Sequence, residues 1–164
     1  MKFRKHFGPH AVIDLDLHMV MMESNALKRF LDAQKLDYER AFSEIEKGRK
    51  QSHWMWYIFP QISGLGKSET ARFFEINNLA EAKAFLEHAV LGSRLIEISR
   101  ELLKLEGKSA NQIFGSPDDQ KLKSSMTLFA LVAHDEKVFN QVLAKYFDGE
   151  KDQQTIRIVD LNQK

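Results

Sequence analysis

Residues 49–61 of the chain read Arg-Lys-Gln-Ser-His-Trp-Met-Trp-Tyr-Ile-Phe-Pro-Gln, and a Gly-Leu-Gly turn follows at 64–66. This stretch holds both tryptophans of the protein, a histidine and a Tyr-x-Phe pair. Aromatic side chains bury large apolar areas, so these rings must anchor the core, line a pocket or do both. Because the stretch is apolar all round, its periodicity fits a buried helix and a buried strand equally. We expect Ser52 to cap a helix and Pro60 to end it.

The composition is that of a single globular domain. The chain has 164 residues, of which 43% are hydrophobic and 29% charged, which supplies a core and argues against disorder. Lys and Arg number 24 against 23 Asp and Glu, so there is no global basic field, and we do not expect nucleic acid as a partner. Cysteine is absent, which excludes disulfides, thiolate nucleophiles and Cys-ligated metals and fits a cytoplasmic location.

The first 23 residues differ from the rest of the chain. Asp14, Asp16 and His18 interrupt the apolar segment that a secretory signal needs, and no apolar run is long enough to span a membrane. We therefore expect no membrane partner. We predict a leader at residues 1–23, as an extension or a disordered segment, and one helical domain at residues 24–161.

Helical periodicity dominates after residue 24. Apolar residues spaced i, i+3, i+4 behind Ser24 predict a first helix, and Asp37 is expected to cap a second one that ends at Gly48. The same signals predict four more helices up to residue 114: one opened by Ser68, one over 79–86, a long one that follows a turn at 90–93 and closes at Gly107, and a short one over 109–114.

The clearest helix start in the chain is Ser116-Pro117-Asp118-Asp119, with a serine cap, proline at the first helical position and two carboxylates in the first turn. Asp135 is expected to cap a last helix that ends at 148–149. The tail 155–161 alternates apolar residues and is expected to form a short strand or a strap. Together these patterns predict an all-α fold, a compact single-domain bundle of about seven or eight helices.

Three blocks of the sequence resemble one family. They are residues 53–61 with Gly64-Leu65-Gly66-x-Ser68; His88-x-Val90-Leu91-Gly92-x-Arg94-Leu95; and Phe114-Gly115-x-Pro117-Asp118-Asp119-x-Lys121-Leu122-x-Ser124-Ser125-Met126-Thr127-Leu128-Phe129. The chain is similar to the DUF1810 family from about Phe30 to Thr155. The resemblance implies a compact, mostly α-helical domain and implies no activity. The family usually has proline where Ala89 stands, so a softer kink is expected there. Some members carry the label calpastatin, which fits badly, because calpain inhibitors of that kind are disordered.

The first group of candidate site residues lies in the aromatic stretch. Trp56 could stack on a base or a sugar beside a titratable His53, and both are equally well explained as core. The other rings, Trp54, Tyr57 and Phe59, are expected in the core. The basic residues Arg49 and Lys50 could meet negative charge on a ligand, although the preceding helix terminus also explains them.

The turn at 61–68 is the second group. Its backbone N–H groups, with Lys67 and Ser68, could hold a phosphate or carboxylate, and Gln61 could donate a hydrogen bond. A plain turn with an N-cap fits the spacing better, because the full Gly-x-x-x-x-Gly-Lys-Ser pattern is absent.

The helix that follows Pro117 supplies the third group. Asp118 and Asp119 could act as acid/base groups or as magnesium ligands, but a helix N-terminus favours carboxylates in any case. Ser125 falls on or near the buried face, where its hydroxyl needs a partner. Together with Ser124 and Thr127 it could line a polar cavity, or these small residues could let two helices approach closely. Lys121 could bind an anion.

Metal binding is not expected. Among the histidines only His6 and His10 have helical ligand spacing, and no His-Glu-x-x-His motif occurs. We expect no metal site and no cofactor.

The function best supported by these residues is binding of a small polar or anionic, nucleotide-like ligand. The pocket would lie between the 53–68 segment and the helix 118–127. The predicted ligand-binding residues are Arg49, Lys50, His53, Trp56, Gln61, Ser68, Lys121 and Ser125. If there is chemistry, the candidate acid/base residues are His53 and Asp118. The alternative is a non-catalytic protein-interaction domain, which a large exposed apolar patch would favour.

Overall fold

The computed structural model describes the backbone of residues 10–164 and the side chains of Leu17 and residues 25–164. The part of the predicted leader at residues 1–9 lies outside this range. Nine helices occupy the described residues: α1 (His10–Glu46), α2 (Met55–Ile58), α3 (Glu69–Phe73), α4 (Leu79–Glu87), α5 (Leu91–Lys104), α6 (Ala110–Phe114), α7 (Asp118–Val132), α8 (Val138–Phe147) and α9 (Gln153–Asn162). Residues 10–164 contain no strand, only an isolated parallel bridge between Ile62 and Ile76. The prediction of an all-α fold is confirmed.

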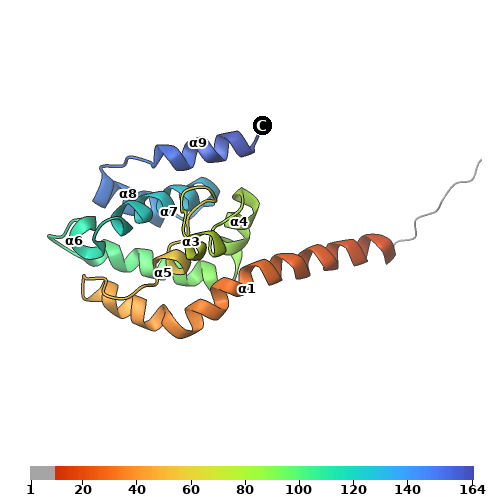
Figure 1. The fold of residues 1–164 in the computed structure, drawn as a ribbon, viewed down its shortest axis with the longest axis horizontal. Helices are drawn as coiled ribbons and strands as arrows, with labels where there is room; N and C mark the ends of the chain where they lie inside the picture. Colours follow the sequence, from red (N-terminus) through yellow and green to blue (C-terminus); the bar gives the residue numbers. More distant parts are fainter. Residues whose placement is uncertain (1–9) are drawn as a thin grey trace, which may run out of the picture.

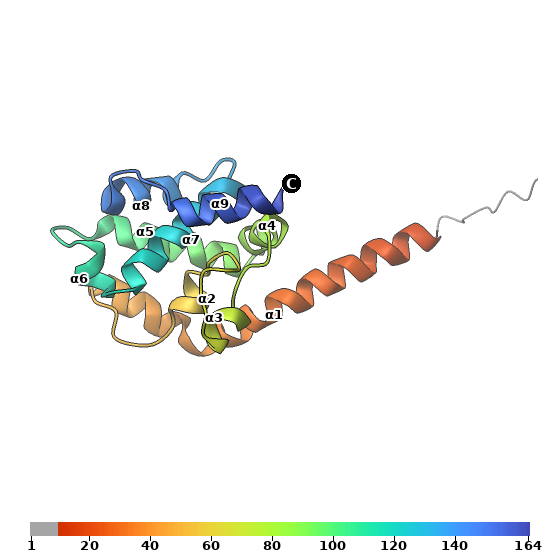
Figure 2. The ribbon, with the colours of Figure 1, turned by 45° about the horizontal axis from the view of Figure 1, so that its top comes forward.

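Helix α1 is continuous where the sequence predicted two helices. It begins upstream of Ser24 and passes Asp37 without a break. No glycine or proline lies between residues 10 and 46, so nothing interrupts the backbone hydrogen bonds. Asp37 does not cap a helix; its carboxylate accepts a hydrogen bond from the hydroxyl of Tyr57 and pairs with Arg40 at 3.4 Å. In Figures 1 and 2 the first part of α1 projects away from the other helices.

Three predicted caps are also wrong. The aromatic stretch forms the single turn α2 without a side-chain cap, and the hydroxyl of Ser52 bonds to Glu44 instead. Helix α7 begins one residue later than predicted, with Pro117 itself at the N-cap position after a cis peptide bond. Helix α8 has Lys137 at its N-cap position and no side-chain cap, and the backbone N–H of Val138 donates to Glu136 at 3.0 Å, so Asp135 does not cap this helix.

The tail forms helix α9, not the predicted strand or strap. Asp152 caps it, because its carboxylate accepts a hydrogen bond from the backbone N–H of Thr155 at 3.0 Å. The apolar alternation was misleading because the buried residues Thr155 and Val159 are four apart, which is a helical spacing.

A row of phenylalanines connects the helices through the core. Phe30 of α1 meets Phe85 of α4 at 5.1 Å between ring centroids, and Phe85 meets Phe129 of α7 at 5.4 Å. Phe129 continues the row to Phe139 of α8 at 5.9 Å. Helix α7 is therefore the central helix, and it packs against α4, α6, α8 and α9.

The turn between α4 and α5 depends on Gly92. A Cβ atom at this position would lie 1.8 Å from the carbonyl oxygen of Leu86, which no side chain can tolerate. The imidazole Nδ1 of His88 accepts hydrogen bonds from the N–H groups of Val90 and Leu91 at 3.1 and 3.3 Å, and so satisfies the start of α5. The predicted turn at 90–93 is thus the first turn of α5 itself.

The aromatic stretch is fixed to α1 by the buried carboxylate of Glu44. It accepts hydrogen bonds from the backbone N–H groups of Gln51 and Ser52 at 2.8 and 3.0 Å and from the indole N–H of Trp54 at 2.8 Å. The Ser52 hydroxyl donates a fourth. Burial raises the pKa of Glu44, but these hydrogen bonds outweigh burial and lower the pKa to about 2 from an ordinary 4.5. Trp54 is 0% exposed, so the expectation that it belongs to the core is met.

We predict that Glu44→Gln lowers the free energy of unfolding at pH 7 by about 3 kcal/mol, at ~1.4 kcal/mol per unit of pKa shift. The folded-state pKa is depressed, so the carboxylate stabilises the protein fully above pH 4.5, and this contribution is lost as the pH falls toward about 2. Urea unfolding at several pH values measures the effect. The exposed Glu46→Gln on the same helix is the control. A difference between wild type and Glu44→Gln that does not shrink at low pH would contradict the assignment.

Candidate functional site

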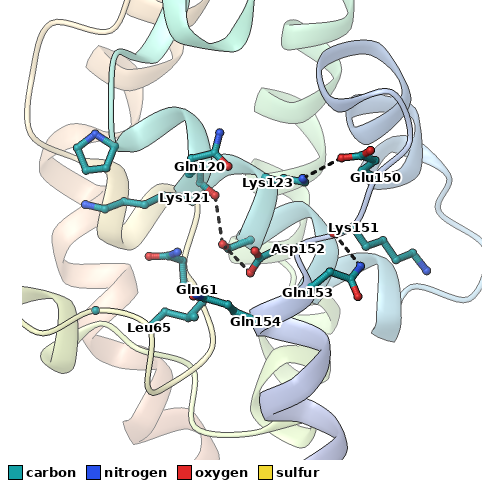
Figure 3. Close-up of a pocket in the computed structure, with 13 residues that line it drawn as sticks. Gln61, Leu65, Gln120, Lys121, Lys123, Glu150, Lys151, Asp152, Gln153 and Gln154 are labelled. Carbon is teal, nitrogen blue, oxygen red and sulfur yellow. Dashed lines mark hydrogen bonds and ion pairs between the residues drawn. The ribbon is translucent and has the colours of Figure 1, made fainter.

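An open cleft of about 930 Å³ lies where three distant segments meet. The segments are the loop after α2, the first half of α7 and the entry to α9, and Figure 3 shows their side chains around the cleft. The lining residues are Gln61, Leu65, Gly66, Pro117, Gln120, Lys121, Lys123, Ser124, Glu150, Lys151, Asp152, Gln153 and Gln154. The predicted pair of walls, the 53–68 segment and the helix 118–127, is present, and α9 adds a third.

The loop wall is held by a short backbone ladder. The N–H of Ile76 donates to the carbonyl of Gln61, and the N–H of Ser63 donates to the carbonyl of Ile76, both at 2.8 Å. Gly66 is required where this loop folds back on α3, because a Cβ there would lie 2.4 Å from the Cβ of Ala71. The side chain of Gln61 is therefore presented to the cleft from a fixed backbone.

Charged residues of the α7 wall form ion pairs that connect the cleft to the core. The carboxylate of Asp118 pairs with Lys50 at 3.0 Å and with Lys121 at 3.3 Å. Each lysine also lies over an indole ring: Lys50 is 5.0 Å from the centroid of Trp54, and Lys121 is 5.3 Å from that of Trp56. Only Lys121 of this group lines the cleft.

The α9 wall is attached to α7 by Asp152. One oxygen of its carboxylate accepts hydrogen bonds from the Thr155 hydroxyl at 2.6 Å and from the Ser124 hydroxyl at 3.1 Å. The backbone N–H of Asp152 donates to the hydroxyl of Thr127 at 2.9 Å. Ser124, Thr127 and Thr155 are all buried, and a buried hydroxyl without a hydrogen-bond partner destabilises the fold. These bonds supply the partners.

The charged side chains around the cleft differ in how strongly they are engaged. Lys123 pairs with Glu150 at 3.5 Å, whereas Lys151 is exposed and forms no ion pair within the part of the chain that the structure describes. In Figure 3, Lys123 and Lys151 extend to one side of the cleft and Lys121 to the other. The cleft lining thus holds three lysines and two carboxylates, those of Glu150 and Asp152, and the carboxylate of Asp152 caps α9.

Two of the predicted ligand-binding residues, Gln61 and Lys121, line the cleft. Trp56 and Lys50 lie beside it: Trp56 through its contact with Lys121, and Lys50 through Asp118. Asp118, predicted as an acid/base candidate, is neutralised by two lysines.

The other predicted residues lie away from the lining. Arg49 and His53 are exposed on the loop before α2, and Ser68 caps α3 by accepting from the N–H of Ala71 at 3.1 Å. Ser125 is 0% exposed, and its hydroxyl has no hydrogen-bond partner among the described residues. Its neighbour Ser124 supplies the hydroxyl that reaches the cleft, because it lies one helical position away on the face toward α9.

The residues at the entry to α9 were missed entirely, together with Gln120 and Lys123 on α7. One signal could have found them: Asp152-Gln153-Gln154-Thr155 places a capping carboxylate three residues before a hydroxyl, which is typical of a helix start. Reading the tail as a strand hid this signal.

The described residues hold neither a metal-binding cluster nor a membrane-spanning helix. No group of three His, Cys, Asp or Glu side chains among them is placed to hold a metal ion, and His6 lies outside the described range. None of the described helices is both long and apolar enough to cross a membrane.

Comparison with known proteins gives two matches. The family model described as "Protein of unknown function (DUF1810)" matches residues 24–159. The crystal structure of the conserved hypothetical protein Rv1873 from Mycobacterium tuberculosis is similar with a TM-score of 0.80 and 45% sequence identity, over 82% of this chain and 96% of that chain. No curated protein matches the chain.

We predict that Asp152→Ala detaches α9 from α7. Losing the cap and the bonds from Ser124 and Thr155 should lower the free energy of unfolding by about 1–3 kcal/mol. Amide hydrogen exchange in residues 153–162 should accelerate more than in α5. The control is Asp160→Ala, an exposed carboxylate on the same helix. Unchanged protection of α9 in Asp152→Ala would show that other contacts hold this wall.

Proposed function

Because the chain belongs to the DUF1810 family, whose description assigns no activity, we propose a function from the cleft itself: the protein binds a small polar ligand that carries an anionic group. The family match confirms the resemblance identified in the sequence. The similar structure is described only as a conserved hypothetical protein, so its description suggests no ligand class.

The observation that carries the proposal is the convergence of side-chain amides and lysine ammonium groups on one cleft. Four glutamines line it, at positions 61, 120, 153 and 154. Within residues 25–164, Gln153 alone of the four uses its side-chain amide in a hydrogen bond, which it donates to the carbonyl of Lys151 at 3.1 Å. An amide offers both a donor and an acceptor, so these side chains suit a ligand with carbonyl, hydroxyl or base-edge groups.

The size and charge of the cleft restrict the class of ligand. A volume of about 930 Å³ suits a small molecule, since ligand pockets commonly measure roughly 300–1,000 Å³. Lys121, Lys123 and Lys151 would neutralise a phosphate or a carboxylate. Leu65 and Pro117 supply apolar surface between the polar groups. A nucleotide combines these features and is the ligand we favour.

The proposal is for binding and assigns no catalytic residue. His53 does not line the cleft, and Asp118 meets it only through Lys121. The alternative of a protein-interaction domain has less support, because the exposed large apolar side chains of the described residues are few and come from four helices and the turn before α5. They are Leu17, Leu36, Phe73, Val90, Leu131 and Leu161.

We predict that ADP raises the melting temperature of the full chain by roughly 5–10 °C at about 100 times its dissociation constant. Gln61→Ala and Lys123→Met should each reduce this shift, because each removes a polar group from the cleft. The exposed Lys83→Met on α4 is the matched control and should leave the shift unchanged. Thermal-shift titrations with ADP, pyrophosphate and adenosine measure the effect. No shift with any of the three, or equal shifts in all variants, would refute the proposal.

A further inference from the structure

We infer that the face of Trp56 is a second part of the same site and that Lys121 covers it until an anion draws this lysine into the cleft. The ligand class is then an aromatic group joined to a phosphate, with the base on Trp56 and the phosphate on Lys121. This inference rests on the proposed function and goes beyond it by naming a moving side chain and a stacking surface.

The ammonium group of Lys121 joins the cleft to the indole ring of Trp56. It lines the cleft, lies over Trp56 at 5.3 Å and reaches Asp118 at 3.3 Å. In Figure 3 it extends away from Asp152 and Gln154. A partly exposed ion pair and a partly exposed cation–π contact are both weak, whereas a lysine–phosphate hydrogen bond is strong, so an anion in the cleft would compete for this lysine.

When Lys121 leaves Asp118, the carboxylate of Asp118 still has an ion-pair partner. Asp118 keeps its second partner, Lys50, at 3.0 Å, and the Lys50 side chain is only 8% exposed. Lys50 is also held over the ring of Trp54, so it cannot follow Lys121 out. Lys50 is thus fixed to the core, whereas the side chain of Lys121 can turn toward the cleft.

Trp56 is placed to accept a base once Lys121 moves. It is half-buried, whereas Trp54 is fully buried with its N–H on Glu44. The hollow beside Trp56 shares Gln61 and Gly66 with the cleft, so the two are adjacent. This hollow measures about 10 Å³, too small for a base, and Lys121 does not line it. A base would therefore stack on the ring face that Lys121 covers.

Calorimetric titration and tryptophan fluorescence of the full chain test the inference, with ADP and pyrophosphate as probes. ADP should quench Trp56 fluorescence, and pyrophosphate should not. Trp56→Ala should weaken ADP binding at least tenfold and change pyrophosphate binding less than twofold, whereas Trp56→Tyr should restore most of the ADP affinity. Lys121→Met should weaken both ligands.

The outcomes separate the inference from the proposed function. If ADP and pyrophosphate bind but Trp56→Ala weakens both equally or neither, the stacking surface is wrong and the anion site stands. If neither probe binds, both fail. If Trp56→Ala does not fold, Trp56→Tyr and Lys121→Met still decide: an unchanged ADP affinity in Lys121→Met would overturn the role of this lysine.

Discussion

The rest of the structure depends on the hydrogen bonds that the carboxylate of Glu44 accepts. Four hydrogen bonds converge on it from the loop that enters the aromatic stretch, one of them from the Trp54 indole. A carboxylate buried without such partners would be strongly destabilising, so the loop has little freedom to take another path. Trp54 is thereby pinned beside Phe59 and Phe114, and α2 begins where α1 dictates.

The cleft follows from this anchoring. The loop that leaves α2 turns back at Gly66 and closes on Ile76, which places Gln61 opposite the first turns of α7. Asp118 then links the anchored stretch to the cleft, because Lys50 on one side belongs to the core and Lys121 on the other belongs to the lining. The polar lining is a consequence of core contacts more than of any local sequence motif.

Sequence reasoning predicted the helices from α3 to α8 and two walls of the cleft, because apolar spacing and capping residues act locally. It failed where long-range contacts decide. Glu44 and Gln34 lie at positions of α1 that face the core. Their hydrogen-bond partners belong to the aromatic stretch, so the sequence of α1 alone does not explain why polar residues are buried there. Asp152 likewise bonds to Ser124, 28 residues earlier in the chain. Trp54 was correctly expected in the core, whereas core and site fitted Trp56 equally well, because the lysine that lies over it comes from α7.

Of the two tryptophans in the aromatic stretch, Trp54 belongs to the core and Trp56 to the proposed site. Hydrogen exchange of the two indole N–H groups, followed by NMR, tests this central claim most directly. The account predicts that the Trp54 indole exchanges only through global unfolding, because Glu44 holds it in the core. The Trp56 indole should exchange orders of magnitude faster. Equal protection of the two indoles, or stronger protection of Trp56, would contradict the account.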